Sequence, residues 1–348
     1  MSTLPRICPD GSTTTNDVDR RGFLKTAGSA ALVAGATPLW ATAKAQAKAT
    51  APASETVVKL LYESLSPDQK KQVCYDWGHV DSERGMLRTR VANNWHINDV
   101  EIDSDFYTAE QKRMIRDIFE GIIQPDWHKR IYRQLDDDCG GFGMDQNMAI
   151  FGKPGAGKFE FVITGRHMTL RCDGDSTEHV AFGGPIFYGH AAAGFNEPAD
   201  HPGNVFWPQA RLANALYQIL DGRQQKLALV KTRPAENAVA FRGPNGTRPG
   251  IPASELSADQ QEHLHKVLAK LLEPYRTTDR QEVAQCLKAQ GGLERCSLAF
   301  YQQGDIGHDG VWDCWRLEGP SFVWYFRGSP HVHVWVNVAD DPTVKLNS

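Results

Sequence analysis

Several features that would mark common classes of protein are missing from this sequence of 348 residues. It has no run of about 18 consecutive apolar residues, so we expect no stable insertion into a membrane. Its 38 basic side chains are outnumbered by 42 acidic ones, and this balance predicts that nucleic acid is not a partner. It also lacks a C-x-x-C pair and a G-x-S-x-G motif, the usual signatures of a zinc ribbon and of a serine hydrolase.

Residues 152–158 come close to a phosphate-binding loop, G-x-x-x-x-G-K-[ST], but do not match it. The last position needs a hydroxyl group to hold magnesium, and Phe159 occupies it. The loop also needs a helix after it, whereas residues 159–164 alternate in the manner of a strand. We therefore predict a turn between two strands here, and no nucleotide binding.

Residues 1–47 are predicted to be a twin-arginine export signal. The pair Arg20-Arg21 is followed by Phe-Leu-Lys, by a short apolar run and by overlapping A-x-A cleavage patterns. Asp19 stands where Ser or Thr is common in such signals. An N-terminal amphipathic helix is the alternative, but the order of these features favours a signal. The expected partner is the twin-arginine export machinery, and the expected location is the periplasm or the outside of the cell.

Removal of this signal changes the composition of the chain. Residues 48–348 contain 33 basic and 39 acidic side chains, for a net charge of −6, and six of the seven cysteines. An oxidising compartment permits disulfides, but six cysteines allow 15 full pairings, so no particular disulfide is predicted. We expect residues 48–348 to form a single domain.

That domain is predicted to be α+β, with mostly antiparallel strands and helices packed on them. Ser66, Thr108 and Ser257 each begin an S/T-x-x-Q pattern, in which the hydroxyl and the Gln side chain cap a helix reciprocally. Asp221 begins a weaker fourth example. Apolar residues recur at helical spacing after Thr108 and Ser257.

An internal duplication is also predicted. The stretch from Thr108 to Pro125 matches the stretch from Ser257 to Pro274 at a constant offset, and similar strand patterns follow both. The two related halves are expected at about 105–175 and 255–327, each as helix, helix, strand, strand. The loop-rich connection over 183–252 contains two stretches of turn residues, 183–208 and 234–252, and we expect both to form ordered loops that line a site.

Histidines are the best chemical lead in the sequence. His331 and His333 lie in P-H-V-H-V-W-V, which reads as a strand, so both imidazoles would face the same side and could share one metal ion. His167 is the expected third ligand and His190 a possible fourth. Three histidines with an open position would suit zinc or copper. The alternative is that these are hydrogen-bonded histidines on a solvated sheet face.

Several short segments carry a resemblance to a known family: Asn94-Trp95-His96, Phe151 to Pro154, Gly165 to Leu170, Pro185 to Gly189, Leu220-Asp221, Arg316 to Pro320 and His331 to His333. In these segments the sequence resembles the family called domain of unknown function 3500. The resemblance implies the fold and the position of a site but no established activity. Where members typically show Gly-His-His-Leu, this chain has Arg166 in place of the first histidine, and residues 337–342 replace an Arg-Asp-Pro segment.

Together these features predict an exported metal-dependent enzyme, a hydrolase or an oxidoreductase, that acts on a small-molecule substrate. Arg166 could hold an anion beside the ion, and Glu318 or Asp313 could act as general base. The substrate is expected to lie against Trp95, Tyr188 and Trp335. Residues 136–138, three aspartates, are predicted to form a solvated turn. The alternatives are a non-catalytic periplasmic metal- or ligand-binding protein, and an envelope protein stabilised by disulfides.

Overall fold

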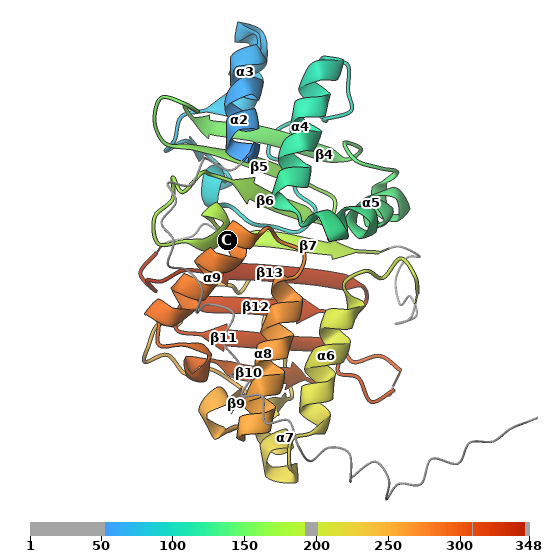
Figure 1. Ribbon diagram of the computed structural model, residues 1–348. Coiled ribbons are helices and arrows are strands. Elements are labelled where there is room, and N and C mark those ends of the chain that lie inside the picture. The colour runs from blue at the N-terminus through green and yellow to red at the C-terminus, as the bar shows by residue number, and fades with distance from the viewer. Residues whose placement is uncertain (1–52, 192–200, 308, 345–348) are drawn as a thin grey trace, which may run out of the picture. The chain divides into compact units, whose positions relative to one another are not determined.

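A mixed sheet forms the centre of the described part of the chain, residues 53–191, 201–307 and 309–344 of a computed structural model (Figure 1). Its strands run in the order β1-β4-β5-β6-β7-β13-β12-β11-β10-β8, with β9 beside β10, while β2 and β3 form a separate hairpin. Neighbours are antiparallel except in the pairs β1–β4 and β8–β10. The predicted export signal lies outside the described residues. The strands are β1 Cys74–Tyr75, β2 Val80–Asp81, β3 Gly85–Met86, β4 Gln146–Gly152, β5 Phe159–Gly165, β6 Met168–Cys172, β7 Ile186–His190, β8 Leu229–Val230, β9 Ile251–Pro252, β10 Ser297–Tyr301, β11 Cys314–Gly319, β12 Phe322–Arg327 and β13 Val332–Val338.

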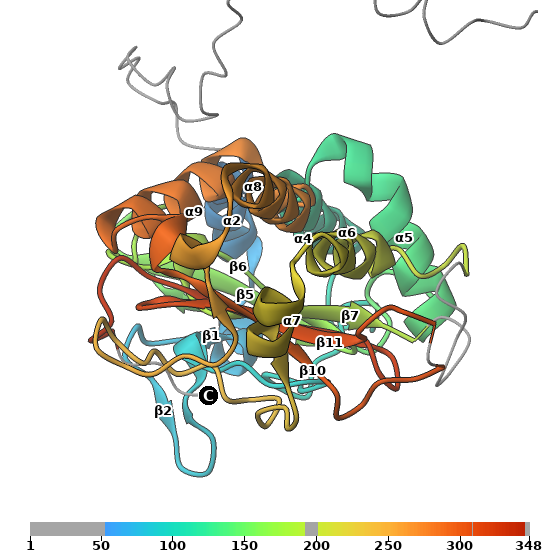
Figure 2. The same ribbon diagram turned by 90° about the horizontal axis from the view of Figure 1, so that it is seen from below.

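Helices cover one face of this sheet, and irregular segments cover the other (Figure 2). The sequence of β13 fits this arrangement, because Val334 and Val336 pack with the helices while Trp335 belongs to a cluster on the opposite face. The predicted α+β class with mostly antiparallel strands is therefore confirmed. The helices are α2 Ala53–Ser64, α3 Pro67–Val73, α4 Ala109–Ile122, α5 Pro125–Cys139, α6 Trp207–Gln218, α7 Gly222–Ala228, α8 Ala258–Leu272 and α9 Thr277–Ala289.

The predicted capping boxes are confirmed at the starts of α3, α4, α7 and α8. Each capping glutamine also joins two helices. The side-chain amides of Gln69 and Gln111 hydrogen-bond each other at 2.9 Å, and so do those of Gln224 and Gln260. One residue type thus caps its own helix and fixes a neighbour, which explains why the pattern stands out in the sequence.

The elements follow the same order twice. The series α2, α3, β1, α4, α5, β4, β5, β6, β7 is followed by α6, α7, β8, α8, α9, β10, β11, β12, β13, apart from short turns and β2, β3 and β9. The two series meet at β7 and β13, which pair in the middle of the sheet. An internal duplication would leave such an order, with halves longer than 105–175 and 255–327, and the duplication itself stays a prediction.

The connection over 183–252 contains regular elements as well as loops: the helices α6 and α7 and the short strands β8 and β9 lie within it. The turn-rich stretch predicted at 183–208 is wrong at Ile186–His190, which forms the central strand β7. This run is short and lies among Gly, Pro and Ala residues, so its pattern resembles a turn although all five residues are buried. The turn predicted at 152–158 is confirmed. Gly152 ends β4 with a φ of 73°, and Phe159 begins β5.

The six cysteines that follow the predicted signal are all free thiols. Cys172, Cys286, Cys296 and Cys314 are buried, and Cys74 and Cys139 are partly buried. Burial raises the pKa of the Cys139 thiol to about 11, so it is not poised to react. The described part of the chain is therefore held together without disulfides.

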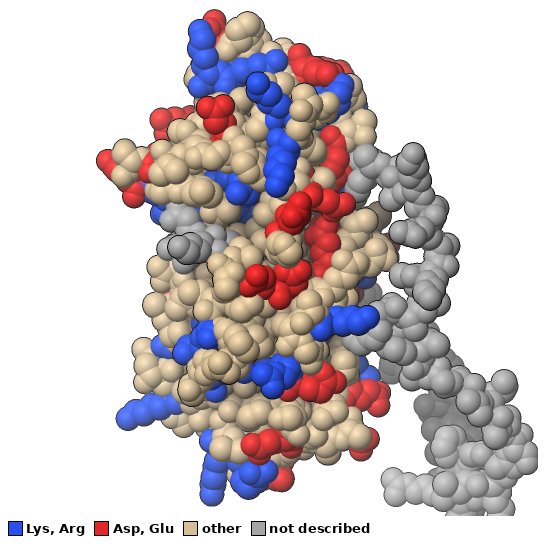
Figure 3. Space-filling model, turned by 90° about the vertical axis from the view of Figure 1, so that its left-hand side faces the viewer, with Lys and Arg blue, Asp and Glu red and all other residues tan. Residues whose placement is uncertain are grey.

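Most charged side chains lie at the surface, where both signs are interspersed (Figure 3), but a group of carboxylates is buried where α2, β6 and α9 meet. Arg276 holds Glu55 at 2.8 Å and Asp279 at 2.7 Å. Asp173 is also buried, and Glu282 accepts a backbone N–H at 3.0 Å. Two of these four carboxylates pair with Arg276 and the other two do not, and burial without a cationic partner favours the protonated form of a carboxyl group.

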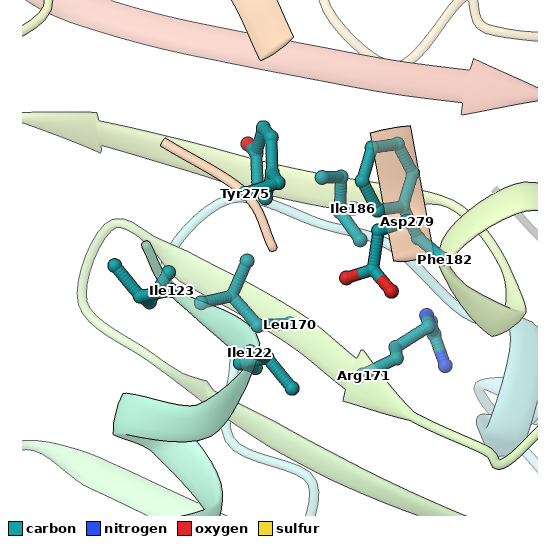
Figure 4. A pocket seen from close by; sticks show the side chains of 8 residues that line it. All are labelled: Ile122, Ile123, Leu170, Arg171, Phe182, Ile186, Tyr275 and Asp279. Carbon is teal, nitrogen blue, oxygen red and sulfur yellow. The ribbon is translucent and has the colours of Figure 1, made fainter. Parts of the chain in front are cut away.

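A small pocket adjoins this group (Figure 4). The Asp279 carboxylate and the Arg171 guanidinium lie at one end of it, and apolar side chains line the rest. Arg171 itself pairs with the buried Glu160 at 2.8 Å. The lining residues are Ile122, Ile123, Leu170, Arg171, Phe182, Ile186, Tyr275 and Asp279.

The buried carboxylates should make the protein less stable as the pH rises. Burial, and then the charge of Asp279, raise the pKa of Glu282 to about 8, and burial raises that of Asp279 to about 6. The folded state therefore binds these protons more tightly than the unfolded state does. The resulting stability is present below about pH 4.5 and is lost as the pH rises through about 8.

We expect the melting temperature of Glu282→Gln to fall less between pH 5 and 8 than that of the wild type, because the amide keeps the hydrogen bond and cannot ionise. Differential scanning calorimetry at several pH values measures this. The matched control is Glu262→Gln, at an exposed carboxylate on α8 that should leave the pH dependence unchanged. Parallel curves for wild type and Glu282→Gln would contradict the prediction.

Candidate metal centre

Three histidines meet at one end of the central strand pair. His333 lies in β13, His331 immediately precedes that strand, and His167 lies in the two-residue turn between β5 and β6. His333 pairs with Gly189 of β7, and β6 borders the other side of β7, so Gly189 lies between His167 and His333. Only glycine fits there, because a Cβ would lie 2.0 Å from the carbonyl oxygen of Val332.

The three imidazoles direct their Nε2 atoms toward one another. Nε2 of His333 lies 2.8 Å from Nε2 of His331 and 3.1 Å from Nε2 of His167. One nitrogen from each ring fits within a group no more than 4.8 Å across. All three residues are buried, with exposed fractions of 2% for His167, 8% for His331 and 3% for His333. The predicted grouping of these histidines is confirmed.

Local hydrogen bonds fix the turn that carries His167. Its backbone adopts a left-handed conformation with a φ of 51°, which is uncommon for residues other than glycine. The side-chain oxygen of Asn94 accepts a hydrogen bond from the His167 N–H at 2.8 Å. Asn94 belongs to the irregular segment after β3, so the turn is held from outside the hairpin.

Asp138 orients His167. One carboxylate oxygen accepts a hydrogen bond from Nδ1 of His167, and the other accepts from Nε of Arg166 at 3.0 Å and from the Ala191 N–H at 3.3 Å. The solvated turn predicted for the three aspartates at 136–138 is therefore wrong. All three lie in the last turn of α5, where Asp136 and Asp137 are exposed. The Asp138 side chain is wholly buried, and its fourth donor is the side-chain amide of Gln134 at 3.2 Å.

Glu236 has the equivalent role for His333. One of its oxygens accepts a hydrogen bond from Nδ1 of His333 at 2.9 Å, and the other pairs with Arg327 at 2.9 Å. Arg327 lies directly opposite His333 on the neighbouring strand β12. Two arginine–carboxylate–histidine chains, one from each side, thus converge on the same point.

These contacts determine which ring nitrogen carries the proton. Because Nδ1 of His167 and Nδ1 of His333 each face a carboxylate, each donates its hydrogen there, and each Nε2 is left with a lone pair. Burial lowers the pKa of His333 to about 4 and that of His331 to about 3, so both rings are neutral at pH 7. Nε2 of His333 therefore presents a lone pair toward Nε2 of His167, 3.1 Å away, where a cation could be bound.

The carboxylates behind the imidazoles are charged. Burial alone would raise the pKa of Asp138, but the hydrogen bond from His167 and the charge of Arg166 bring it below its usual value. Burial likewise opposes the ionisation of Glu236, and the His333 hydrogen bond and Arg327 outweigh it and lower its pKa.

The donor set and its dimensions fit a transition-metal ion. Zinc bonds to imidazole at about 2.0–2.1 Å, so two nitrogens of a tetrahedral site lie about 3.3 Å apart. The observed separations of 2.8 Å and 3.1 Å are a few tenths of an ångström shorter. Imidazole nitrogens are common ligands of zinc, and the rings often donate their other N–H to a carboxylate, as His167 and His333 do here.

His190 and Tyr188 lie on the other face of the sheet from this centre. His190 pairs with Val332 and packs against Phe206, with ring centroids 6.1 Å apart. The Tyr188 hydroxyl donates to Gln209 and accepts from an indole N–H within the helix-covered core. The structure therefore does not bring His190 together with the other three histidines.

The two tryptophans that are predicted to contact substrate, Trp95 and Trp335, lie nearer to the three histidines than His190 and Tyr188 do. Trp335 is two residues beyond His333 on the same face and packs against Phe187, with ring centroids 4.9 Å apart. Trp95 follows Asn94 and donates its indole N–H to the Thr169 hydroxyl at 2.9 Å. Both side chains are buried.

Glu318 and Asp313, the predicted general bases, have other partners. Glu318 lies at the far end of β11 from the histidines and accepts hydrogen bonds from Arg242 at 2.7 Å and Arg316 at 3.1 Å. Asp313 accepts the Ile306 N–H, and burial raises its pKa to about 7. The structure brings neither of them into contact with the three histidines. Arg166, by contrast, lies beside the centre with its side chain 37% exposed.

Fold and site together define an α+β protein with a buried three-histidine centre. A family described as "Protein of unknown function (DUF3500)" matches residues 45–336, most of the chain, and the chain belongs to this family. Comparisons with curated proteins and with solved structures found no match. None of the helices in the described ranges has the length and apolar character needed to cross a membrane.

Proposed function

We propose that the protein is a metal-dependent enzyme in which His167, His331 and His333 hold one divalent transition-metal ion. The observation that carries the proposal is the convergence of three buried Nε2 atoms, two of them on rings that carboxylates orient. When bound, such an ion would supply a Lewis acid for hydrolysis if it is zinc, or an electron carrier for oxidation if it is copper. The carboxylate–histidine pairs favour zinc and a hydrolase.

The chain's own residues would serve this centre in three ways. Asp138 and Glu236 keep the ring protons on Nδ1 and the lone pairs on Nε2. Arg166 and Arg327 keep those carboxylates ionised. Glu236, whose side chain is 27% exposed, is the carboxylate in this network that can exchange a proton with solvent. Glu318 has no part in this proposal, because two arginines engage it elsewhere on the sheet.

The alternative is a protein that holds a metal ion or another ligand without catalysis. The burial of all three histidines supports it, because a carrier needs to retain an ion and not to admit a substrate. The two proposals share the metal site and differ in turnover. Metal-loaded protein that converts no ester, amide, sugar or phenol would favour the carrier.

We further propose that the protein is exported in folded form by the twin-arginine machinery. The Arg20-Arg21 pair and the cleavage patterns after it support this. The variant carrying both Arg20→Lys and Arg21→Lys should accumulate inside the cell as the uncleaved chain. Cell fractionation and mass measurement of the N-terminus test this, and Arg6→Lys, upstream of the pair, is the control. Normal export of the double variant would refute the proposal.

Metal analysis tests the site directly. Protein purified without an affinity tag should contain about one transition-metal ion per chain, and the double variant His331→Ala, His333→Ala should contain almost none, because two of three ligands are lost. Inductively coupled plasma mass spectrometry measures the content. The control is His263→Ala, at a histidine on α8 that hydrogen-bonds the Leu212 carbonyl. If the wild-type protein contains no stoichiometric metal, both the metal-dependent enzyme and the metal-carrier proposals are wrong.

Loss of the carboxylate behind His167 should weaken metal binding without abolishing it. In Asp138→Asn the side chain keeps its shape but loses the charge that makes His167 a strong ligand, so affinity should fall about 10–100-fold. Competition with a chromogenic chelator measures the dissociation constant. Asp137→Asn, one position earlier and facing Arg133, is the matched control. Equal affinities in both variants would contradict the assigned role of Asp138.

A further inference from the structure

Buried N–H donors without acceptors gather beside the three histidines. Arg327 is 5% exposed and uses Nη1 for Glu236, while its Nε and Nη2 have no hydrogen-bond partner among the residues that the structure describes. The same is true of Nη1 of Arg233 and of the indole Nε1 of Trp335. All four atoms are donors, and a buried donor left unpaired costs about 1–3 kcal/mol.

The strand register and one crossing segment bring these donors together. Arg327 lies opposite His333, and Trp335 lies opposite Tyr325. After β8 the chain crosses the sheet face that bears these residues, because the Tyr325 hydroxyl donates to the Pro234 carbonyl at 3.1 Å. Arg233 directly precedes that contact. The charge of Arg233 is close enough to act with burial in lowering the pKa of Arg327.

The charges around the histidines do not balance. Asp138 is paired with Arg166 and Glu236 with Arg327, whereas no ion pair of Arg233 occurs within the described ranges. These two carboxylates and three guanidinium groups together carry one positive charge in excess. A divalent ion on the histidines would raise the excess to three. Such an excess requires an anion.

We propose that Arg327 and Arg233, with the Trp335 indole, bind an oxyanion group of the substrate, a carboxylate or a phosphoryl group, next to the metal. The inference rests on the proposed metal site and names its substrate class as anionic. Guanidinium groups match the two oxygens of such groups in a bidentate manner, and an indole N–H adds a third donor. Arg233 is only partly buried, so the ligand reaches the site from its side.

The test is to titrate the metal-free protein with inorganic phosphate and to measure the binding by isothermal titration calorimetry. Without metal, the titration reports on the arginines whether or not the histidines bind an ion. We expect saturable binding to the wild type and about tenfold weaker binding to Arg233→Gln, which loses one charged hydrogen bond. The affinity of Arg233→Lys, which keeps the charge but loses the two parallel N–H donors of the guanidinium, should fall between those two values. This variant replaces Arg233→Gln in the test if Arg233→Gln does not fold.

The matched control is Arg223→Gln, at an exposed arginine on α7 paired with Glu255, which should bind phosphate as the wild type does. A parallel titration with acetate distinguishes a carboxylate from a phosphoryl group. Absence of saturable binding of either anion to the wild type, or equal binding by Arg233→Gln and Arg223→Gln, overturns the inference. Metal content, measured separately for Arg233→Gln, should equal that of the wild type, so a failed metal site and a failed anion site give different results.

Discussion

The pairing of β7 with β13 is the constraint on which the rest of this molecule depends. It joins two series of elements into one sheet and sets His167, which borders β6, level with His333 in β13. A shift of one residue in this register would turn His333 toward the helices and Val334 toward the opposite face. Gly189 permits the match, since a side chain there would collide with the neighbouring strand.

The site is held by contacts from segments that are far apart in the chain. Asp138 lies in helix α5, and Glu236 lies in the segment that crosses the sheet after β8. Asn94 lies in the irregular segment between β3 and α4. Each orients a ring or a backbone group that the sheet alone would leave free to turn. Such outer contacts decide whether three histidines form a metal site or a set of separate hydrogen bonds. The convergence of three Nε2 atoms is compatible with the first.

Local sequence patterns predicted much of the fold and half of the site. Helix caps at Ser66, Thr108 and Ser257 depend on residues three positions apart, and the alternation around His333 depends on residues two apart, so both can be read from one sequence. Asp138 lies 29 residues from His167, and Glu236 lies 97 residues from His333. No local spacing signals such pairs. Strand β7 could not be predicted because glycine and proline, which are typical of turns, dominate the sequence around it.

The six free thiols have a consequence for where this protein can mature. A fold that needs no cystine can form completely in a reducing compartment, without an oxidant or an isomerase, and its stability does not change when the redox potential changes. If the protein is transported in folded form, no disulfide would have to form before or after transport. The buried cysteines act as small apolar side chains in the core.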